Sequence, residues 1–578
     1  MSAAVIRIAP SPAADDSQRQ RRRAQPKGRQ VDAQALAEVL ALLGDQAPQR
    51  ELLIEYLHRI QDRHGHLSAA HLAALAQALR LAQTEVYEVA SFYHHFDVVH
   101  DGEPAPPPLT VRVCDGLSCQ LAGAEALRAE LAARCGAGVR VLGAPCVGRC
   151  EQAPVAVVHQ NPVGAASADA VLAAVAAGAT THEHAGHIGF AAYRASGGYA
   201  LLERCWRGEH SADAVIATLD DAGLRGLGGA GFPAGRKWRL VRAQPAPRLL
   251  AVNIDEGEPG TFKDRWYLER DPHRFLEGAL IAAWAVGVAA VYLYLRDEYH
   301  GLRAMLQDEL AALRASDLGA ALPRIELRRG AGAYVCGEES AMIESIEGKR
   351  GLPRLRPPYV AQLGLFGRPT LAHNFETLHW VRELVERGAG WFAGQGRHGR
   401  HGLRSYSVSG RVRQPGVKLA PAGITLRELV DEYCGGLPAG HELYAWLPGG
   451  ASGGIFPASL ADLPLDFDTL QSHGGFIGSA AVIVLTRSAT HCDRAVDAAR
   501  HLMRFFRDES CGQCTPCRSG TAKADALIAT DRWDLPLLAE LSAVMRDASI
   551  CGLGQAAPNP IDSVVRHFGH ELEAGAEP

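Results

Sequence analysis

The sequence predicts a multidomain α/β protein, and three observations favour this fold class. The chain has 578 residues, enough for about three to five domains. Its apolar share of 47% is typical of globular domains that bury a core. Residues 200–395 alternate between strand and helix character, as expected for helices packed on a parallel sheet.

Composition excludes several classes of protein. The formal net charge is −5, so no global attraction draws the chain to nucleic acid or to anionic lipid. The first residues lack the apolar core of a secretory signal, and the uncharged stretch from Gly278 to Leu295 has the composition of a buried helix that runs into a strand. We therefore expect a cytoplasmic protein without a membrane span, in which clustered thiols indicate metal rather than disulfides.

Shifts in composition divide the chain into segments with different expected structures. These are a disordered basic arm at 1–31, helices followed by a compact α/β unit at 32–178, a histidine-rich linker at 179–199, an α/β domain at 200–400, a β-rich domain at 401–490 and a helical domain at 491–578.

The segment 32–178 shows the clearest local patterns. Apolar residues at helical spacing predict helices up to residue 96, with Ser68 as an N-cap. After a Pro-rich break, the pattern predicts strands at 109–113, 139–142 and 155–159 and helices at 121–133 and 168–177. The linker that follows carries His182, His184 and His187, but without a Cys or Asp beside them we expect no metal site there.

The first cysteine group is Cys114-x4-Cys119 followed by Cys146-x3-Cys150. Cys114 ends an expected strand and Cys146 follows Pro145 at the end of another, so both pairs are expected on loops at one edge of a small sheet. Four converging thiolates suit an iron–sulfur cluster. A structural zinc site and free thiols remain alternatives on spacing alone.

The second cysteine group is more specific. Cys511, Cys514 and Cys517 are each three residues apart, and Cys551 stands far downstream. Three such thiolates can bind three corners of a cubane and a distant fourth completes it, whereas zinc sites rarely use this tripod, so a 4Fe–4S cluster is predicted. The other cysteines show no ligand spacing and are expected to be small buried side chains: Cys135, Cys205, Cys336, Cys434 and Cys492.

A glycine-rich loop spans Gly226 to Gly231 and matches G-x-G-x-x-G. The Rossmann fingerprint must follow a strand and open a helix, but here a helical run at 214–219 precedes the loop, and Pro233 and Gly235 interrupt an immediate helix. What remains is a flexible loop rich in backbone amides, suited to phosphate, with Arg236 and Lys237 just downstream. A plain turn is the alternative.

Two acidic segments complete the pattern. An expected strand at 248–252 leads into Asn253-Ile-Asp-Glu-Gly-Glu258, and Gly330 to Ser340 carries the adjacent pair Glu338-Glu339. Carboxylates repel phosphate but suit sugar hydroxyls, an amide or a proton. Either segment alone could be a solvated surface run. With the loop and the two cysteine groups, they indicate the pocket of an organic redox cofactor.

Electron counting identifies that cofactor. Nicotinamide exchanges two electrons as hydride, whereas an iron–sulfur centre moves one. A chain that combines both needs a converter, and flavin is the usual one. The residues therefore predict NAD(H), flavin and iron–sulfur chemistry in one chain.

Specific motifs then resemble a known family. The resemblance is to the NADH- and flavin-binding subunit of respiratory complex I, and it rests on Gly223–Pro233, Asn253–Asp264, Gly332–Ser340 and Glu509–Gly520. The unit at 32–178 is similar to the thioredoxin-like 2Fe–2S subunit of that enzyme. The fusion of the two resembles the β (diaphorase) subunit of soluble molybdenum- or tungsten-dependent NAD formate dehydrogenases, and also that of NAD-reducing hydrogenases. Three motifs favour the formate dehydrogenases: Pro26–Asp32, His95–Val99 and Gly226–Gly228.

The resemblance implies a fold and cofactors for each segment. It implies an N-terminal helical bundle with a thioredoxin-like 2Fe–2S domain, a Rossmann-like FMN- and NAD-binding domain, a small ubiquitin-like domain of soluble-ligand-binding type and a C-terminal helical bundle with a 4Fe–4S cluster. The implied ligands are Cys114, Cys119, Cys146 and Cys150 for the first cluster, and Cys511, Cys514, Cys517 and Cys551 for the second.

It also implies roles for individual residues. Gly226, Gly228, Gly229 and Lys237 would line the FMN phosphate and NAD side; Asn253, Asp255, Glu256, Tyr334, Gly337 and Glu338 would hold flavin; Asn374 and Thr377 would contact the FMN phosphate or ribityl chain. Glu258 and Glu339 would face nicotinamide, and Phe232 and Tyr359 would stack on adenine. Arg356 and Tyr359 stand where relatives carry Lys and Phe, Leu227 where they often carry Arg and His373 where they carry Asn, and these departures affect phosphate contact and NAD affinity.

By this resemblance the chain passes electrons from a partner's formate oxidation through iron–sulfur clusters and FMN to NAD⁺, with hydride leaving from flavin N5. The implied partner is a catalytic molybdenum or tungsten formate dehydrogenase α subunit that carries further iron–sulfur clusters. A hydrogenase or a quinone-reducing complex is the alternative partner within this class. Outside it, the chain could be a zinc-stapled, non-catalytic assembly module.

Overall fold

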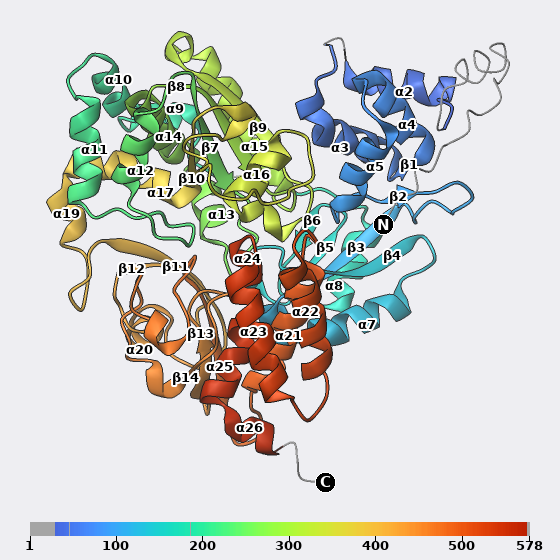
Figure 1. Cartoon of the computed structure of the whole chain (residues 1–578), viewed down its shortest axis with the longest axis vertical. Helices are drawn as coiled ribbons and strands as arrows, with labels where there is room; N and C mark the ends of the chain where they lie inside the picture. The colour runs from blue at the N-terminus through green and yellow to red at the C-terminus, as the bar shows by residue number, and fades with distance from the viewer. Residues whose placement is uncertain (1–28, 45–46, 185, 575–578) are drawn as a thin grey trace, which may run out of the picture.

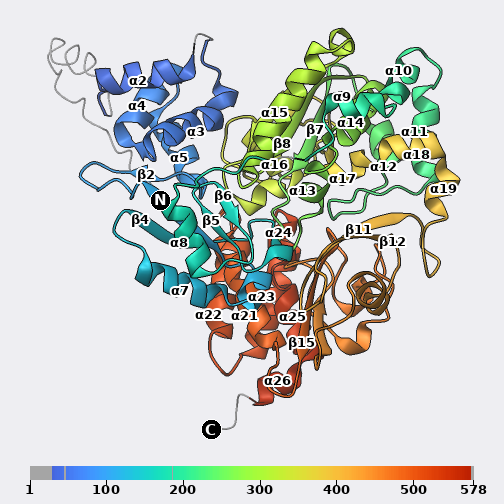
Figure 2. The ribbon, with the colours of Figure 1, turned by 180° about the vertical axis from the view of Figure 1, so that it is seen from behind.

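A computed structural model describes residues 29–44, 47–184 and 186–574 of the chain. Most of the basic arm expected at 1–31, with the beginning of the Pro26–Asp32 motif, lies outside these residues. Figure 1 and Figure 2 show the described chain from opposite sides, with its helices and sheets packed against one another. None of the described helices has the length and apolarity needed to cross a membrane.

Four described α-helices form the N-terminal bundle, and two of them begin at a side-chain N-cap. The four are α2 (Ala33–Leu43), α3 (Leu53–His64), α4 (Ala69–Leu79) and α5 (Gln83–Phe92). The Asp32 side chain accepts a hydrogen bond from the backbone of Ala35, and Ser68 accepts one from His71, so Ser68 is the N-cap that the sequence predicts. Two short parallel strands, β1 (Leu67–Ser68) and β2 (Val98–Val99), join the loop before α4 to the chain after α5.

A four-stranded sheet in the order β4-β3-β5-β6 forms the next unit. Strand β3 pairs parallel with β4 and antiparallel with β5, and all three lie where the sequence predicts strands. Most of the expected helix at 121–133 is α7, and Gly123, with a φ of 87°, separates it from the short helix α6 that precedes it. The elements are β3 (Leu109–Cys114), α6 (Leu117–Leu121), α7 (Ala124–Arg134), β4 (Val139–Ala144), β5 (Ala156–Val158), β6 (Asn161–Val163) and α8 (Ala168–Ala176).

The segment expected to be a histidine-rich linker contains helix α9 (Phe190–Ala195). His187 pairs with Glu309 at 2.8 Å, and His184 hydrogen-bonds to the carbonyl of Glu269 at 2.6 Å. The two histidines therefore serve separate structural contacts.

The central domain is a parallel sheet in the order β10-β7-β8-β9, covered by helices. The apolar stretch from Gly278 to Leu295 is the end of buried helix α14, its left-handed C-cap Gly287 and the buried strand β8, as predicted. The strands are β7 (Arg248–Ile254), β8 (Val288–Leu295), β9 (Arg324–Arg329) and β10 (Thr370–Asn374). The helices are α10 (Ala200–Trp206), α11 (Ala212–Asp221), α12 (Ala234–Arg242), α13 (Lys263–Leu268), α14 (Pro272–Val286), α15 (His300–Ala315), α16 (Glu339–Ile346), α17 (Phe375–His379), α18 (Val381–Arg387) and α19 (Ala389–Ala393).

The β-rich domain is a mixed sheet in the order β12-β11-β15-β13-β14. Its first and last strands in chain order, β11 (Leu403–Gly410) and β15 (Ala481–Arg487), lie parallel and next to each other. The other elements are β12 (Gly416–Pro421), α20 (Leu426–Glu428), β13 (Glu442–Leu447) and β14 (Phe456–Pro457). The C-terminal bundle contains α21 (Ala495–Asp508), α22 (Thr515–Ile528), α23 (Leu535–Ala548), α24 (Gly552–Ala556), α25 (Asn559–His567) and α26 (Gly569–Ala574).

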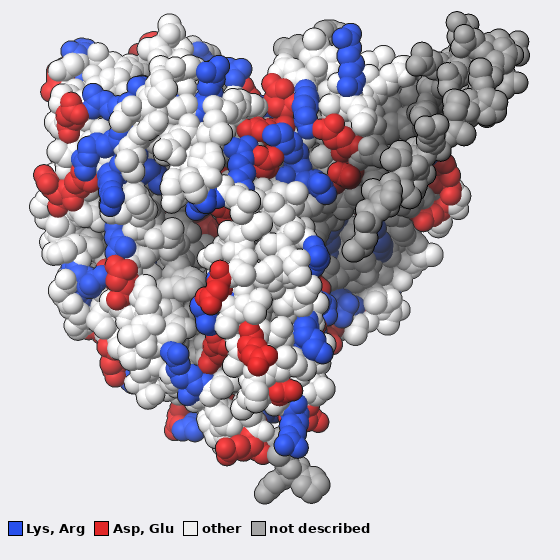
Figure 3. Space-filling model, in the orientation of Figure 1, with Lys and Arg blue, Asp and Glu red and all other residues white. Residues whose placement is uncertain are grey.

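The hydrophobic cores extend across these units. One cluster of buried side chains runs from Ala35 in α2 through Met342 in α16 to Val564 in α25. A second joins the central domain to the β-rich domain, from Leu250 in β7 to Val484 in β15. Packing between domains thus fixes the relative positions of loops that are far apart in the sequence. The face shown in Figure 3 carries interspersed basic and acidic side chains, in keeping with the low net charge.

Candidate functional site

The candidate site begins at the carboxyl edge of the central sheet. Because its strands are parallel, the segments that follow β7, β8, β9 and β10 meet at one edge, which is where ligands bind in open α/β sheets. The segment after β7 carries the acidic residues 255–258, and Arg296, Asp297 and Glu298 follow β8. Chain order and sheet topology alone therefore bring several charged groups together.

The glycine-rich loop closes over this edge. The backbone of Gly226 donates a hydrogen bond to the carbonyl of Phe232 at 2.8 Å, which closes the loop, and the amide of Leu227 donates to Thr377 Oγ1 at 2.9 Å. A Cβ on Gly228 would lie 2.8 Å from that of Asn374, so the loop backbone packs directly against the end of β10. The loop follows helix α11, which confirms that it is no Rossmann fingerprint. Helix α12 begins immediately after it with Pro233 as N-cap, so the expectation that Pro233 and Gly235 interrupt such a helix is wrong.

The acidic segment after β7 is divided between structural and site-facing carboxylates. Glu256 accepts hydrogen bonds from the amides of Asp264 and Arg265, at 2.6 and 3.0 Å, and from the Tyr299 hydroxyl at 2.7 Å. Its carboxylate therefore anchors helix α13. Burial raises the pKa of Asp255 to about 8, so this side chain carries a proton near neutral pH.

Glu258 faces a different set of partners. One oxygen accepts from the amide and the hydroxyl of Ser452, at 2.8 and 2.9 Å, and the other accepts from the Tyr334 hydroxyl. Burial raises the pKa of Glu258 above its ordinary value. The Tyr334 amide in turn donates to Glu509 at 2.9 Å, two residues before Cys511. A short chain of hydrogen bonds thus runs from the sheet edge to the second cysteine group.

The acidic pair after β9 meets the cations that the sequence indicates. Glu338 caps helix α16 by accepting from the amides of Ser340 and Ala341. Glu339 lies 3.5 Å from the ammonium of Lys237 and 3.1 Å from the guanidinium of Arg356. The Asn253 side chain donates to the carbonyl of Gly337 at 2.7 Å, which ties β7 to this segment.

The first cysteine group converges as the sequence predicts. Cys114, Cys119, Cys146 and Cys150 are all buried, and the thiols of Cys146 and Cys150 lie 3.3 Å apart. Hydrogen bonds with the neighbouring thiols, and then burial, raise the pKa of Cys114 and of Cys150. Phe262, from the segment between β7 and α13, packs against Cys146 and Cys150, so this group lies beside the central domain.

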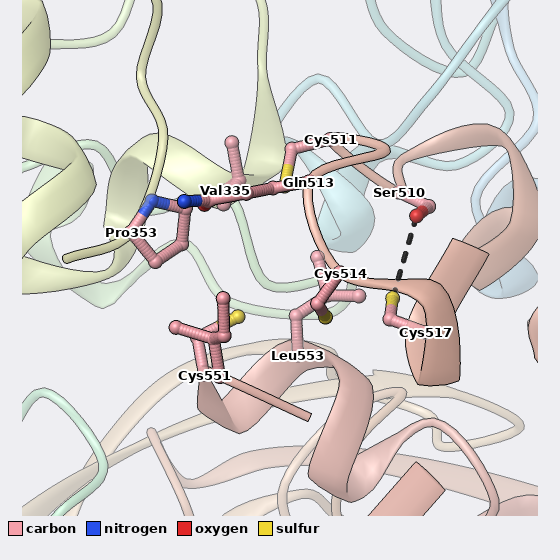
Figure 4. A pocket seen from close by; sticks show the side chains of 10 residues that line it. Val335, Pro353, Ser510, Cys511, Gln513, Cys514, Cys517, Cys551 and Leu553 are labelled. Atoms are coloured by element: carbon pink, nitrogen blue, oxygen red, sulfur yellow. Dashed lines mark hydrogen bonds between the residues drawn. The ribbon is translucent and has the colours of Figure 1, made fainter. Parts of the chain in front are cut away.

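The second cysteine group lines a separate pocket at the beginning of helices α22 and α24. Figure 4 shows the side chains of Cys511, Cys514, Cys517 and Cys551 around this pocket, with Ser510 Oγ hydrogen-bonded to Cys517 Sγ at 3.3 Å. A Cβ on Gly554 would lie 2.5 Å from Ser549 Oγ and 2.8 Å from Cys517 Cβ, so only glycine allows this close approach. Burial raises the pKa of Cys517 to about 12 and that of Cys551 to about 11, so a bound cation is needed to hold these thiolates.

A polar cavity of about 200 Å³ lies between these parts. Its lining includes Cys146 of the first group, Asp255 and Arg296 from the sheet edge, and Tyr334 and Glu509 from the hydrogen-bonded chain to the second group. The sheet edge and the first cysteine group therefore border one cavity, and Glu509, two residues before Cys511, connects that cavity to the segment of the second group.

Comparisons with known proteins agree with this geometry. Residues 219–383 match the Nuo51 FMN-binding domain, residues 39–178 the thioredoxin-like [2Fe-2S] ferredoxin, and residues 497–575 the NADH-ubiquinone oxidoreductase-F iron-sulfur binding region. An NADH-quinone oxidoreductase chain of Rhizobium meliloti is 41% identical over 406 residues, which cover 68% of this chain and 95% of that protein. The mitochondrial 51 kDa subunit of NADH-ubiquinone oxidoreductase in Neurospora crassa is 42% identical over 383 residues, which cover 63% of this chain and 77% of that protein. The chain belongs to this family of 51 kDa NADH oxidoreductase subunits.

A solved structure extends the comparison beyond the NADH-quinone oxidoreductases. A chain in the crystal structure of an NAD⁺-reducing [NiFe]-hydrogenase in the H₂-reduced state is 35% identical, with a TM-score of 0.79. The similarity covers 92% of this chain and 94% of the hydrogenase chain. It therefore includes the N-terminal 2Fe–2S unit as well as the part shared with the 51 kDa subunits.

This member of the 51 kDa family is an NADH-dependent flavin iron–sulfur oxidoreductase of diaphorase type, with domains for FMN, a 2Fe–2S cluster and a 4Fe–4S cluster. The donor sets fit these groups. Four thiols converge in each cysteine group, and the glycine loop approaches Asn374 too closely for any side chain at Gly228. The predicted cofactors and the multidomain α/β fold are thus confirmed.

The structure brings most of the predicted site residues to one edge, but with unequal roles. Gly226, Gly228 and Gly229 lie in the loop that packs on Asn374 and Thr377, whereas the Glu256 carboxylate is used by helix α13. Phe232 and Tyr359 are 36% and 56% exposed, outside the hydrogen-bonded network. Of the five cysteines without ligand spacing, the structure buries three, as expected: Cys205, Cys336 and Cys434. The expectation is wrong for Cys492, which is exposed, and Cys135 is half-buried.

Some residues of the site are absent from the sequence-based prediction. Arg296 and Glu298 follow β8 just as the acidic segment follows β7, so the same carboxyl-end rule could have identified them. Lys263 is buried and pairs with Asp264 at 2.7 Å and with Glu376 at 3.0 Å. Ser452, which holds Glu258, comes from another domain, and no local sequence signal indicates it.

Proposed function

We propose that the chain is the diaphorase subunit of a soluble NAD-linked formate dehydrogenase and passes electrons from formate, oxidised by a molybdenum- or tungsten-containing partner, to NAD⁺. The observation that carries this proposal is that one cavity at the flavin-domain edge is lined by Cys146 of the first cysteine group and by Glu509, two residues before Cys511 of the second. When bound, FMN supplies hydride exchange with NAD(H) at N5 and one-electron exchange with iron–sulfur clusters. Every cysteine of the described chain is free of disulfides, which supports a reducing compartment such as the cytoplasm.

The chain's own residues supply binding and orientation. The amides of the loop at 226–231 and the ammonium of Lys237 would bind the FMN phosphate. Asn253, fixed by Gly337, would position the flavin. Glu258 and Glu339 would orient the nicotinamide, because each is held by fixed partners at the entrance to the sheet edge.

The test is Cys514→Ala in the complex with its partner. Loss of one ligand of the second cysteine group should leave reduction of flavin by NADH largely intact and abolish formate-dependent reduction of NAD⁺. Cys492→Ala is the matched control, because that cysteine is exposed and lies outside both groups. Full formate-dependent reduction of NAD⁺ by Cys514→Ala would show that electrons do not pass this cluster.

A second candidate partner is a hydrogenase, favoured by the similarity to a chain of an NAD⁺-reducing [NiFe]-hydrogenase over 92% of this protein. Metal analysis of the native complex separates the two. Molybdenum or tungsten in the partner supports formate oxidation, whereas nickel assigns the chain to hydrogen oxidation.

A further inference from the structure

A cluster of metal-ligating side chains lies in the N-terminal bundle, outside the cofactor site. Glu38 of α2, His64 at the end of α3 and His71 in the first turn of α4 each bring one ligand atom to within 4.8 Å of the others. They meet because α2 packs on both α3 and α4. In Figure 1 and Figure 2 these helices lie at the opposite end of the molecule from the C-terminal bundle.

We propose that Glu38, His64 and His71 form a binding site for a divalent transition-metal ion, with Zn²⁺ as the preferred ion. Two imidazoles and one carboxylate are a donor set of zinc sites that keep a fourth position open to water. Zinc–ligand distances of about 2.0–2.2 Å place the ligand atoms of a tetrahedral site roughly 3.3 Å apart. The triad must therefore contract by at most about 1.5 Å, which a change of side-chain torsions can supply.

Neighbouring groups already orient two of the ligands. Glu38 Oε2 lies 2.9 Å from His71 Nε2, and Gln34 donates to the other oxygen of Glu38 at 2.9 Å. Ser68 Oγ lies 3.0 Å from His71 Nδ1. A hydroxyl can donate or accept a hydrogen bond, so Ser68 suits both tautomers of His71. Without an ion, His71 carries its proton on Nε2 and donates it to Glu38, while Nδ1 accepts from Ser68. With an ion bound, the proton is on Nδ1 and is donated to Ser68, so that Nε2 is free to bind the metal.

His64 supplies the third ligand. Its ring centroid lies 4.3 Å from that of His71, and among the described residues its ring nitrogens make no hydrogen bond. A cation at this point gives both imidazoles and the carboxylate a common partner. The competing explanation is a simple Glu38–His71 ion pair that joins α2 to α4.

The test measures zinc binding to the purified holoprotein with both iron–sulfur clusters intact. The variants are Glu38→Gln and His64→Gln, whose side chains are only half-buried, and the matched control is His66→Gln, a histidine of the same loop outside the triad. We expect one zinc per chain after desalting in the unmodified protein and in the control. Each triad variant should bind zinc at least about 100-fold more weakly, because even loss of an outer-shell partner costs 10–100-fold.

X-ray absorption at the zinc edge identifies the ligands independently of enzyme activity. The proposal requires nitrogen and oxygen neighbours with imidazole scattering, whereas a zinc–sulfur distance near 2.3 Å would assign the ion to cysteines. The proposal is overturned by zinc–sulfur scattering, by equal retention of zinc in the triad variants, or by an unmodified holoprotein that retains no zinc. Unchanged circular dichroism of the variants excludes misfolding as the cause of a loss.

Discussion

At the scale of single residues, the glycine loop shows how closely the backbone approaches the site. A Cβ at Gly228 would lie 2.8 Å from the Cβ of Asn374, shorter than real contacts between such atoms. At Gly226 the nearest atom to an added Cβ is the carbonyl oxygen of Phe232 at 3.6 Å, an ordinary van der Waals contact. The two glycines therefore look alike in the sequence, but only the position of Gly226 has space for a side-chain methyl group.

Gly228→Ala should consequently weaken FMN binding while Gly226→Ala should not. Overpacking of a tight contact costs about 1–3 kcal/mol, which corresponds to roughly 5–150-fold in affinity if the loop moves to relieve it. The dissociation constant of FMN, measured by quenching of flavin fluorescence on reconstitution, checks this difference. Equal affinities in the two variants would mean that the loop backbone does not contact the cofactor.

At the scale of elements, helix α3 joins the N-terminal bundle to the central domain through a buried histidine. His58 is 3% exposed, and its Nε2 lies 2.8 Å from the carbonyl oxygen of Gly330, just after β9. Burial lowers the pKa of His58 from 6.5 to about 3. In the unfolded chain the same imidazole takes up its proton near pH 6.5, so below that pH the unfolded state binds more protons than the native state.

The free energy of unfolding should therefore fall as the pH drops below about 6.5, and the loss from His58 should continue down to about pH 3. At pH 5 this loss amounts to about 2 kcal/mol. His58→Gln keeps a donor for Gly330 but does not titrate. Between pH 7 and pH 5, the free energy of unfolding of this variant should therefore fall by about 2 kcal/mol less than that of the unmodified protein. Urea unfolding at both pH values measures the difference, and identical falls in the two proteins would contradict this role.

Elements with strong local patterns could be predicted from the sequence. The strand at 109–114, the Ser68 cap and the junction at Gly287 follow from apolar spacing and capping chemistry. Helix α12 could not be predicted in this way, because Pro233 and Gly235 argue locally against a helix there. Yet Pro is tolerated at the start of a helix. Gly235 packs so closely against Asp220 that a Cβ at this position would clash with the Asp220 side chain.

The site divides in the same way. Cysteine spacing predicted the two groups of neighbouring thiols, because the geometry of a cluster constrains the spacing of its ligands directly. The separate roles of Glu256 and Glu258 could not be read from the sequence, since they depend on Tyr299 and on Ser452 from distant segments. Tertiary contacts therefore decide which carboxylate of an acidic run faces the site.

At the scale of the whole molecule, a buried arginine connects the 2Fe–2S domain to the central domain. Arg265, at 2% exposure, donates to the carbonyl of Gly148 at 2.8 Å, inside the loop between Cys146 and Cys150. The same guanidinium pairs with Glu269 at 2.9 Å and with Glu151. Arg265 thus contributes one of the buried links between the first cysteine group and the flavin domain, next to that of Arg296, which donates to the carbonyl of Cys146 at 2.8 Å.

Arg265→Ala should release this connection. It leaves the Glu269 carboxylate and the carbonyl of Gly148 buried without their main partner, and breaking a buried pair in this way costs about 3–5 kcal/mol. We expect faster hydrogen exchange throughout the segment from β3 to α8, and a lower denaturant midpoint.

Arg270→Ala is the matched control for that prediction. This neighbouring arginine has a side chain that is 51% exposed, lies over the Trp266 ring at 4.2 Å and approaches Glu269 only to 3.7 Å. Because exposed pairs contribute less than about 1 kcal/mol, its loss should leave exchange in the segment from β3 to α8 unchanged. If Arg265→Ala leaves exchange in this segment as slow as Arg270→Ala does, the two domains are held by other contacts, such as the apolar contact at Phe262, and not by Arg265.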